Sequence, residues 1–288
     1  MRISESLKKS VSFLELNTSQ SPEESKIEAH SILMQVLNLN KTALYKIYDH
    51  KIDKISQEKI DEILELRKKN IPLSYILNSH IFYKDNFYVD KNVLIPRPET
   101  EYIIDKIIEY GDRVFEEKKR CIFLDTGTGS GCVGITIANQ RPAWDILLSD
   151  LYMDTLKVAK INMSICQNCN INLICADWLS SFADESIDFI FSNPPYIPIS
   201  DKCLDISVQI NEPENALFSG IEGLDDTKKI ISLSKNVLSP LGILFLENGM
   251  GQSSKVISLL DSNDFTDIKV HLDYNDMERF TSSRRYYG

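Results

Sequence analysis

Long apolar runs are missing from this sequence of 288 residues, and their absence excludes a chain that crosses a membrane through hydrophobic helices. Histidine is scarce too. The four histidines lie in unlike segments without a Ser or Cys nucleophile pattern, so a catalytic triad is not expected. Basic residues are outnumbered, because 32 Lys and Arg against 42 Asp and Glu give a formal net charge of -10. This charge opposes direct binding to the phosphates of nucleic acids.

The N-terminus and the cysteines indicate the compartment. Met1-Arg2-Ile3-Ser4-Glu5 starts a polar, amphipathic segment rather than a signal peptide, so we expect a cytoplasmic protein. The six cysteines lie mostly within apolar runs, which is typical of reduced thiols. Cys166 and Cys169 have the C-x-x-C spacing of redox and zinc sites, but a second C-x-x-C and a nearby His pair are lacking. We therefore expect free thiols and no metal site.

The length of the chain favours two domains of unequal size. Early apolar residues recur at helical spacing, as at Leu7, Val11 and Leu14. Ser21-Pro22-Glu23-Glu24 combines an N-cap hydroxyl, a proline in the first turn and early acids, which marks a helix start. An all-helical N-terminal domain is therefore predicted for residues 1–75. We expect it to recognise the substrate, because a domain whose site opens at a sheet edge needs a separate surface to dock a large partner.

Two short aromatic segments follow this helical region and predict a β-hairpin connector over residues 76–92. The segments span residues 81–83 and 87–89, and Lys84-Asp85-Asn86 between them is expected to form the turn. Residues 93–288 are predicted to form the larger domain.

From residue 121 onward, predicted strands alternate with predicted helices. The strands are expected at 121–124, 146–148, 171–175, 187–191 and 243–246, and the helices at 132–139, 155–165 and 228–237. The chain ends with a predicted pair of strands at 265–271 and 279–287. This order is typical of an α/β fold, in which a mostly parallel sheet of seven strands carries helices on both faces.

A glycine-rich loop joins the first predicted strand of this domain to its first helix. Its sequence is Asp125-Thr126-Gly127-Thr128-Gly129-Ser130-Gly131. Glycines at this position let backbone amides approach a ligand closely. The segment from Gly129 to Gly134 also matches G-x-G-x-x-G, and Asp150 follows about 20 residues later, as in dinucleotide-binding folds. The loop therefore indicates a nucleotide-like cofactor without specifying which one, and a tight turn without a ligand is the alternative.

Acceptors and an aromatic ring follow the next two strands. Asp150 ends the second strand, where its carboxylate can accept hydrogen bonds from both hydroxyls of a ribose. Asp177 and Trp178 follow the third strand and can hold the amino group and the ring of an adenine. The structural alternatives are a helix cap for Asp150 and a plain core position for Trp178.

The sequence Asn193-Pro194-Pro195-Tyr196 directly follows the strand that ends near Ser192. A hydride-transfer enzyme has no need of this sequence at this position. Methylation of an amide nitrogen needs hydrogen-bond acceptors there, because the nitrogen lone pair becomes available only as the nitrogen pyramidalises. The Asn193 side-chain oxygen and the Pro194 carbonyl can accept from the amide N–H groups, and two prolines keep the turn rigid. Tyr196 can enclose the nitrogen and face a sulfonium cation. The alternative is an ordinary turn.

Three further charged residues leave two interpretations open. Arg97 and Glu99 lie between prolines, where they can clamp a ligand or form an internal ion pair. Glu247 ends an apolar strand and can cap a neighbouring loop.

With these motifs in place, nearly the whole chain resembles the protein-(glutamine-N5) methyltransferases of release factors, the HemK or PrmC family. The segments that carry the resemblance, besides the glycine loop and Asn193 to Tyr196, are Pro72-Leu73-Ser74-Tyr75-Ile76, Phe82-Tyr83, Leu94-Ile95-Pro96-Arg97-Pro98-Glu99-Thr100-Glu101, Glu212-Pro213, Ala216-Leu217, Gly220-Ile221-Glu222-Gly223-Leu224, Leu246-Glu247-Asn248-Gly249, Asp273 and Glu278-Arg279. Two departures are Asn78, where many members have glycine, and Gln209-Ile210-Asn211, where an Arg-aromatic pair is common.

The resemblance implies a five-helix N-terminal domain and a class I, Rossmann-like methyltransferase domain that uses S-adenosylmethionine. The implied substrate is the glutamine of the GGQ motif in class I peptide chain release factors, methylated in support of translation termination. The cofactor would contact Asp125, Thr126, Gly127, Thr128, Gly129, Gly131, Asp150, Asp177, Trp178 and Asn193, and the glutamine would contact Asn193, Pro194, Pro195 and Tyr196. We expect a monomer with no metal, no direct nucleic-acid contact and no membrane contact.

Three alternatives remain open at this point. A methyltransferase acting on a glutamine of a large-subunit ribosomal protein would share every catalytic residue and differ in the N-terminal domain. An adenine-N6 methyltransferase of DNA or RNA would need a basic surface and base flipping, which the acidic balance disfavours. A scaffold without activity would have no need of the intact glycine loop and Asn193.

Overall fold

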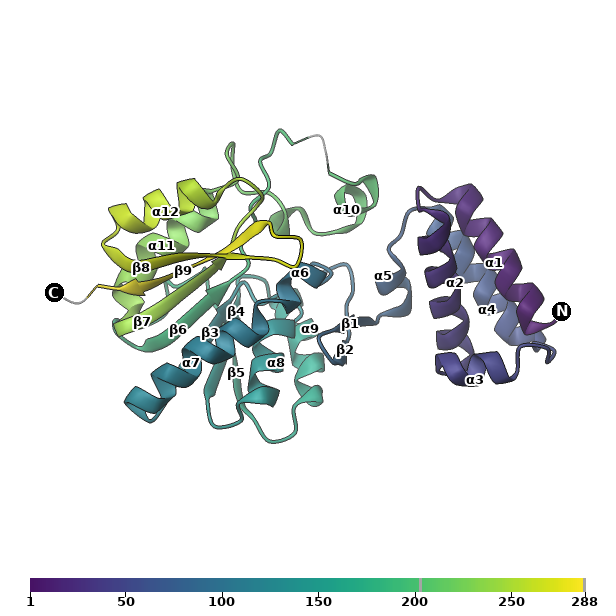
Figure 1. Cartoon of the computed structure of the whole chain (residues 1–288), viewed down its shortest axis with the longest axis horizontal. Coiled ribbons are helices and arrows are strands. Elements are labelled where there is room, and N and C mark those ends of the chain that lie inside the picture. The colour runs from purple at the N-terminus through teal and green to yellow at the C-terminus, as the bar shows by residue number, and fades with distance from the viewer. Residues whose placement is uncertain (202–203, 287–288) are drawn as a thin grey trace. The chain divides into compact units, whose positions relative to one another are not determined.

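The structure is a computed structural model that describes residues 1–201 and 204–286. The chain divides into two compact units (Figure 1). The smaller unit comprises Met1–Ser79 together with Asp205–Asn211, and the larger comprises His80–Leu204 together with Glu212–Gly288. One short segment from the middle of the sequence thus belongs to the N-terminal unit.

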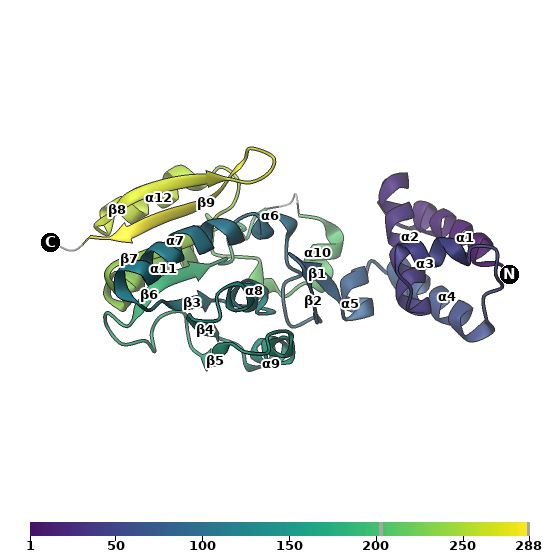
Figure 2. The same cartoon turned by 60° about the horizontal axis from the view of Figure 1, so that its bottom comes forward.

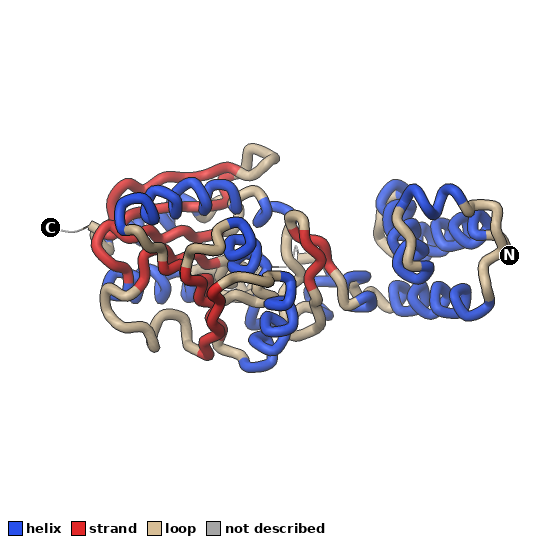
Figure 3. The backbone as a smooth tube through the Cα atoms, turned by 90° about the horizontal axis from the view of Figure 1, so that it is seen from below, coloured by secondary structure: helices blue, strands red, loops and turns tan. Residues whose placement is uncertain are grey.

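The smaller unit is built from helices (blue in Figure 3), as predicted. The helices from its N-terminal part are α1 (Ile3–Asn17), α2 (Pro22–Leu37), α3 (Lys41–Lys46), α4 (Lys54–Lys68) and α5 (Leu73–Leu77). Their apolar stripes meet in one core, in which Leu14, Ile32 and Leu33 are fully buried. The helical spacing read from the sequence therefore marks the buried face.

Helix ends in this unit follow the local sequence closely. The Ser21 hydroxyl accepts from the Glu24 N–H, and the Glu24 carboxylate accepts from the Ser21 N–H, so a capping box starts α2 where predicted. Helix α5 ends at Asn78, which has a left-handed backbone with φ of 48°. Asparagine tolerates this conformation better than most residues, which explains how it replaces the glycine that is common there.

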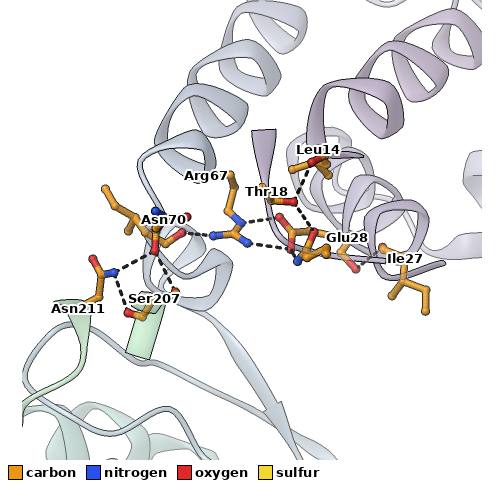
Figure 4. A network of polar contacts seen from close by, with 11 residues as sticks. Leu14, Thr18, Ile27, Glu28, Arg67, Asn70, Ser207 and Asn211 are labelled. Atoms are coloured by element: carbon orange, nitrogen blue, oxygen red, sulfur yellow. Dashed lines mark hydrogen bonds and ion pairs between the residues drawn. The ribbon is translucent and has the colours of Figure 1, made fainter. Parts of the chain in front are cut away.

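A buried ion pair joins α2 to α4. The Arg67 guanidinium donates to both carboxylate oxygens of Glu28, and the two side chains are only 9% and 10% exposed (Figure 4). Arg67 also donates to the carbonyl of Ile71. Three residues beyond Arg67, the Asn70 carbonyl accepts from the side chains of Ser207 and Asn211, at 2.9 Å each. Helix α10 (Ile206–Asn211) is fastened to the end of α4 in this way.

The predicted hairpin is present at the start of the larger unit, but its turn was misplaced. Strands β1 (His80–Phe82) and β2 (Asp85–Phe87) pair antiparallel with Phe82 opposite Asp85. The turn is therefore Tyr83-Lys84 rather than Lys84-Asp85-Asn86. Tyr83 adopts a φ of 58°, which tyrosine rarely does, so turn propensity favoured the wrong residues. Phe82 and Phe87 are buried in the core of the larger unit.

Seven strands form the sheet of the larger unit, which confirms the predicted fold. They are β3 (Ile122–Thr126), β4 (Asp145–Asp150), β5 (Asn170–Cys175), β6 (Ile187–Ser192), β7 (Leu238–Glu247), β8 (Phe265–Leu272) and β9 (Glu278–Arg285). The strand order is β5-β4-β3-β6-β7-β9-β8. The first five in sequence pair in parallel, and β9 pairs antiparallel with both β7 and β8 at one edge (yellow in Figures 1 and 2).

Helices cover both faces of this sheet. The bounds are α6 (Pro98–Glu101), α7 (Ile104–Lys118), α8 (Cys132–Gln140), α9 (Met153–Asn162), α11 (Asp225–Val237) and α12 (Ser253–Ser262), with short 3-10 turns at Met163–Ile165 and Glu214–Ala216. On one face α7 and α8 pack against Phe123, Phe189 and Phe245. On the other face α11 and α12 pack against Leu124 and Ile190. Successive side chains of a strand point to opposite faces of the sheet, so each strand contributes to the core on both faces.

Two expectations drawn from composition have different outcomes. Within residues 1–201 and 204–286, no helix is long and apolar enough to span a bilayer. The cysteine expectation is wrong for one pair, because Cys166 and Cys169 are joined in a disulfide. The chain turns back between α9 and β5 there, which brings the two side chains together. Cys121 and Cys132 are free and buried as expected, and burial raises the pKa of the Cys132 thiol to about 12.

The buried ion pair predicts a large stability effect. Glu28→Ala should lower the free energy of unfolding of the helical unit by about 3 kcal/mol, because it leaves the Arg67 charge buried without its partner. Urea denaturation followed by circular dichroism measures this. Glu58→Ala, which removes an exposed pair with Lys54, is the control and should change little. Equal stability of the two variants would show that the buried pair contributes nothing.

Candidate active site

The carboxyl ends of β3, β4 and β6 lie side by side, because parallel pairing aligns them. Thr126 at the end of β3 is opposite Ser149 of β4, and Asp125 is opposite Phe191 of β6. The loops that leave these ends enclose a cavity of about 470 Å³. Ligands of open α/β sheets bind at this edge. The cavity is therefore the candidate active site.

Most of the residues predicted to bind a cofactor or substrate line this cavity. They are Asp125, Gly127, Thr128, Gly129, Asp150, Asp177, Trp178, Asn193 and Pro195. Four predicted residues within the described part of the chain, Thr126, Gly131, Pro194 and Tyr196, are not in its wall. Thr126 is buried below the wall, and its carbonyl accepts from the Ser192 hydroxyl at 2.8 Å. Gly131 starts α8, where a Cβ would come within 2.8 Å of the Ile135 side chain.

The buried Asp125 carboxylate fixes the glycine loop from below. One of its oxygens accepts from the Thr128 hydroxyl at 2.7 Å and from the Gly134 N–H at 3.1 Å. Burial raises the pKa of Asp125 to about 6, although both hydrogen bonds favour the charged form. Gly127 has a φ of 72°, and a Cβ there would lie 2.8 Å from the Trp178 ring. The loop can therefore take this shape only with glycine at this position.

Asp150 bridges two loops and also faces the cavity, but it does not cap α9, whose N-cap is Tyr152 without a side-chain cap hydrogen bond. One oxygen accepts from the Gly129 N–H at 3.2 Å, and the other accepts from the Tyr152 N–H at 3.1 Å, at the start of α9. Burial raises the pKa of its carboxyl. A carboxylate has about four lone-pair positions, so both oxygens can still accept from a ligand.

The part of the cavity around Asp177 and Trp178 contains two residues that the sequence did not suggest. Lys229 donates to both oxygens of Asp177, at 2.7 and 2.6 Å, and the Trp178 indole N–H donates to Asp226 at 3.0 Å. Lys229 and Asp226 come from α11, about 50 residues further along the chain. Their sequence neighbourhood carries no motif, so only the folded structure identifies them. Trp178 has a left-handed backbone conformation with φ of 49°.

The loop after β6 presents Asn193 and Pro195 to the cavity. Among the described residues, none hydrogen bonds the Asn193 side chain, so its amide oxygen remains available to a ligand. Tyr196 is not in the cavity wall. Its hydroxyl is hydrogen bonded to Glu247, and its backbone carbonyl accepts from the Gln252 side chain at 3.0 Å. Burial raises the pKa of the Tyr196 hydroxyl.

Arg97 forms the internal ion pair that was one of its two interpretations. Its guanidinium donates to Glu212 at 2.9 Å, and the other Glu212 oxygen accepts from the Ile95 N–H at 3.2 Å. Glu212 is buried, and burial raises the pKa of its carboxyl while the Arg97 charge opposes the rise. Arg97 also lies in the cavity wall. The pair joins the segment before α6 to the segment after Asn211.

Comparison with known proteins decides the family. Residues 5–77 match the PrmC N-terminal domain, and residues 113–220 match the methyltransferase small domain. The release factor glutamine methyltransferase of Francisella tularensis is 34% identical over 263 residues, which cover 91% of this chain and 92% of that relative. The protein of the same name from Clostridium acetobutylicum is 33% identical over 285 residues, with 97% of each covered. The chain belongs to the release factor glutamine methyltransferase family.

As a member of this family, the chain is a methyltransferase that uses S-adenosylmethionine as methyl donor. The predicted enzyme class and cofactor are therefore confirmed. The catalytic domain of hMettl16, solved in complex with the MAT2A 3'UTR hairpin 6, has the same fold. The TM-score is 0.51 at 16% identity, with 70% of this chain and 76% of that chain covered. The likeness supports the class I methyltransferase fold.

The residues in the cavity fit this cofactor. The Asp150 carboxylate would accept from ribose hydroxyls, and the Trp178 ring beside Asp177 would provide a flat face for adenine. Gly129 has a φ of 57°, and a Cβ built on it would meet nothing within 4 Å, so the loop leaves open space toward the cavity. In the described ranges, no group of three or more His, Cys, Asp and Glu side chains is arranged to hold a metal ion.

Asp150→Ala should weaken S-adenosylmethionine binding by about 1.5–3 kcal/mol, the range for hydrogen bonds to a charged group. Isothermal calorimetry measures this directly. Asp154→Ala is the matched control, because Asp154 is an exposed carboxylate on the first turn of α9 that pairs with Lys157. The ribose role is wrong if both variants bind the cofactor as the wild type does.

Proposed function

We propose that the enzyme transfers the methyl group to the side-chain amide nitrogen of a glutamine, the one in the GGQ motif of class I release factors. The names of the relatives support the release factor as substrate. The single observation that carries the amide chemistry is Asn193, whose side chain reaches the cavity without a protein partner in the described residues. The choice of the GGQ glutamine within the release factor comes from the family resemblance of the sequence.

The chain's own residues would act on the amide as follows. Bound S-adenosylmethionine supplies a methyl group on a positively charged sulfur. The Asn193 side-chain oxygen and the Pro194 carbonyl would each accept from one N–H of the substrate amide, which favours pyramidalisation and frees the nitrogen lone pair. Pro194 and Pro195 fix their own φ angles, so these acceptors are held in place before the reaction.

The proposed role of Tyr196 changes in the light of its position. Its hydroxyl is hydrogen bonded to Glu247, and Tyr196 is not in the cavity wall. We therefore propose no direct contact between Tyr196 and the sulfonium. Of the residues of this motif, Asn193 and Pro195 lie in the cavity wall, so Asn193 carries the proposed chemistry. Pro194 is outside the wall, and the acceptor role of its carbonyl stays a prediction.

Labelling in a cell extract tests the substrate class. The enzyme is incubated with extract and S-adenosylmethionine that carries a radioactive methyl group, and the labelled molecules are identified by mass spectrometry. Release factors should carry the label. A labelled ribosomal protein would favour the sister activity, and labelled nucleic acid would contradict the proposal. The net charge of -10 opposes the last outcome.

Asn193→Ala should lower kcat by about 10²–10³-fold, corresponding to ~2.7–4 kcal/mol, by analogy with loss of one preorganised donor in an oxyanion hole. Cofactor affinity should barely change, because the side chain is proposed to face the acceptor amide rather than the adenosine. Steady-state kinetics at saturating release factor measures kcat, and calorimetry measures the cofactor affinity. Asn236→Ala, an exposed position on α11, is the control. A near wild-type kcat would reduce Asn193 to a turn residue.

A further inference from the structure

A buried carboxylate lies behind the candidate site and has no part in the chemistry proposed above. Glu247 is the last residue of β7 and is 1% exposed. Its neighbour Leu246 pairs with Ser192, the last residue of β6. Glu247 therefore lies at the same sheet edge as Asn193, one strand further along. Its carboxylate accepts from the Thr100 hydroxyl at 2.8 Å.

Glu247 and the segment after it hold Tyr196 at several points. The Tyr196 hydroxyl is hydrogen bonded to the Glu247 carboxylate. The Tyr196 carbonyl accepts from the Gln252 side chain at 3.0 Å, and the Gln252 oxygen accepts from the Gly249 N–H at 2.8 Å. The Tyr196 ring lies against Gly249, where a Cβ would come within 3.1 Å of the ring. The segment 247–252 thus contacts both ends of this one residue.

Fixing Tyr196 also fixes Asn193, because only two prolines separate them and each has a locked φ. We propose that Glu247 is a positioning residue, which holds Tyr196 and, through the two prolines, aims the Asn193 side chain into the cavity. This inference rests on the proposed function of Asn193. It also explains why a tyrosine that is absent from the cavity wall ends the motif.

The surroundings of Glu247 make its charge sensitive to pH. Burial raises the pKa of Glu247 to about 7, while the Thr100 hydrogen bond and the Arg279 charge on β9 oppose the rise. Glu99 on α6 raises it further, and Tyr196 and the Cys132 thiol of α8 also interact with Glu247. The charged carboxylate accepts from Thr100 and Tyr196 together, whereas the protonated form must use one oxygen as a donor. Positioning should therefore improve as the pH rises through about 7.

Glu247→Gln tests the inference against Glu278→Gln, which removes the same charge at an exposed position at the start of β9. We expect kcat for the release factor to fall about 10- to 100-fold, as for a displaced catalytic group, with the cofactor Kd unchanged. The wild-type kcat should rise with pH around 7, and this dependence should be lost in Glu247→Gln. Wild-type kcat and pH dependence in Glu247→Gln would overturn the proposal, as would a parallel loss of cofactor affinity.

Tyr196→Phe is a second variant that keeps the ring and removes the hydroxyl. It should reproduce the loss of kcat seen in Glu247→Gln. The double variant should lose no more kcat than either single variant, because both substitutions remove the same contact. Additive losses in kcat would overturn the proposal.

Deuterium exchange without substrate separates this inference from the proposed function. A peptide covering residues 193–199 should exchange faster in Glu247→Gln than in the wild type or Glu278→Gln. In the wild type its Ile197 and Ile199 N–H groups donate to Leu217 and Gly220. Faster exchange supports positioning even if the wild type leaves release factors unmethylated, an outcome that would reject the proposed function alone. Unchanged exchange would contradict positioning by Glu247.

Discussion

The parallel pairing of β3 with β4 on one side and β6 on the other is the constraint on which the larger unit depends. It brings the ends of three strands to one edge, although they lie about 70 residues apart in the sequence. The glycine loop, Asp150 and Asn193 each follow or end one of these strands. Their convergence is thus a consequence of hydrogen bonding between backbones, and the site needs few contacts of its own to assemble.

Buried carboxylates then hold the loops at this edge. Asp125 accepts from two groups of the glycine loop and α8, Glu212 accepts from Arg97 and the Ile95 N–H, and Glu247 accepts from Thr100. At the far end of β6, Asp188 accepts from Lys118, Ser239 and the Ile122 N–H. A buried charge is costly unless it is paired, so each loop that supplies its donors is strongly constrained. Asn193 can then remain without a hydrogen-bond partner among the described residues.

The order of strands and helices, and nine residues of the cavity wall, could be predicted because both depend on local sequence. The Asp125 to Gly131 loop and Asn193 each follow an apolar run, and that position alone locates them at the sheet edge. Lys229, Asp226 and Gln252 could not be found this way. Their contacts with Asp177, Trp178 and Tyr196 depend on the docking of distant helices and turns. The position of the hairpin turn was predicted wrongly for a different reason. Tyr83 adopts a left-handed conformation imposed by strand pairing, against its own preference.

The central claim is that this edge of the sheet presents the methyl donor to a glutamine amide. Tandem mass spectrometry of a purified release factor, incubated with the enzyme and S-adenosylmethionine, tests it most directly. We predict that the mass of one methyl group appears on the GGQ glutamine side chain and requires both enzyme and cofactor. A methyl group on any other residue, or an unmodified release factor beside methylated nucleic acid, would contradict the claim.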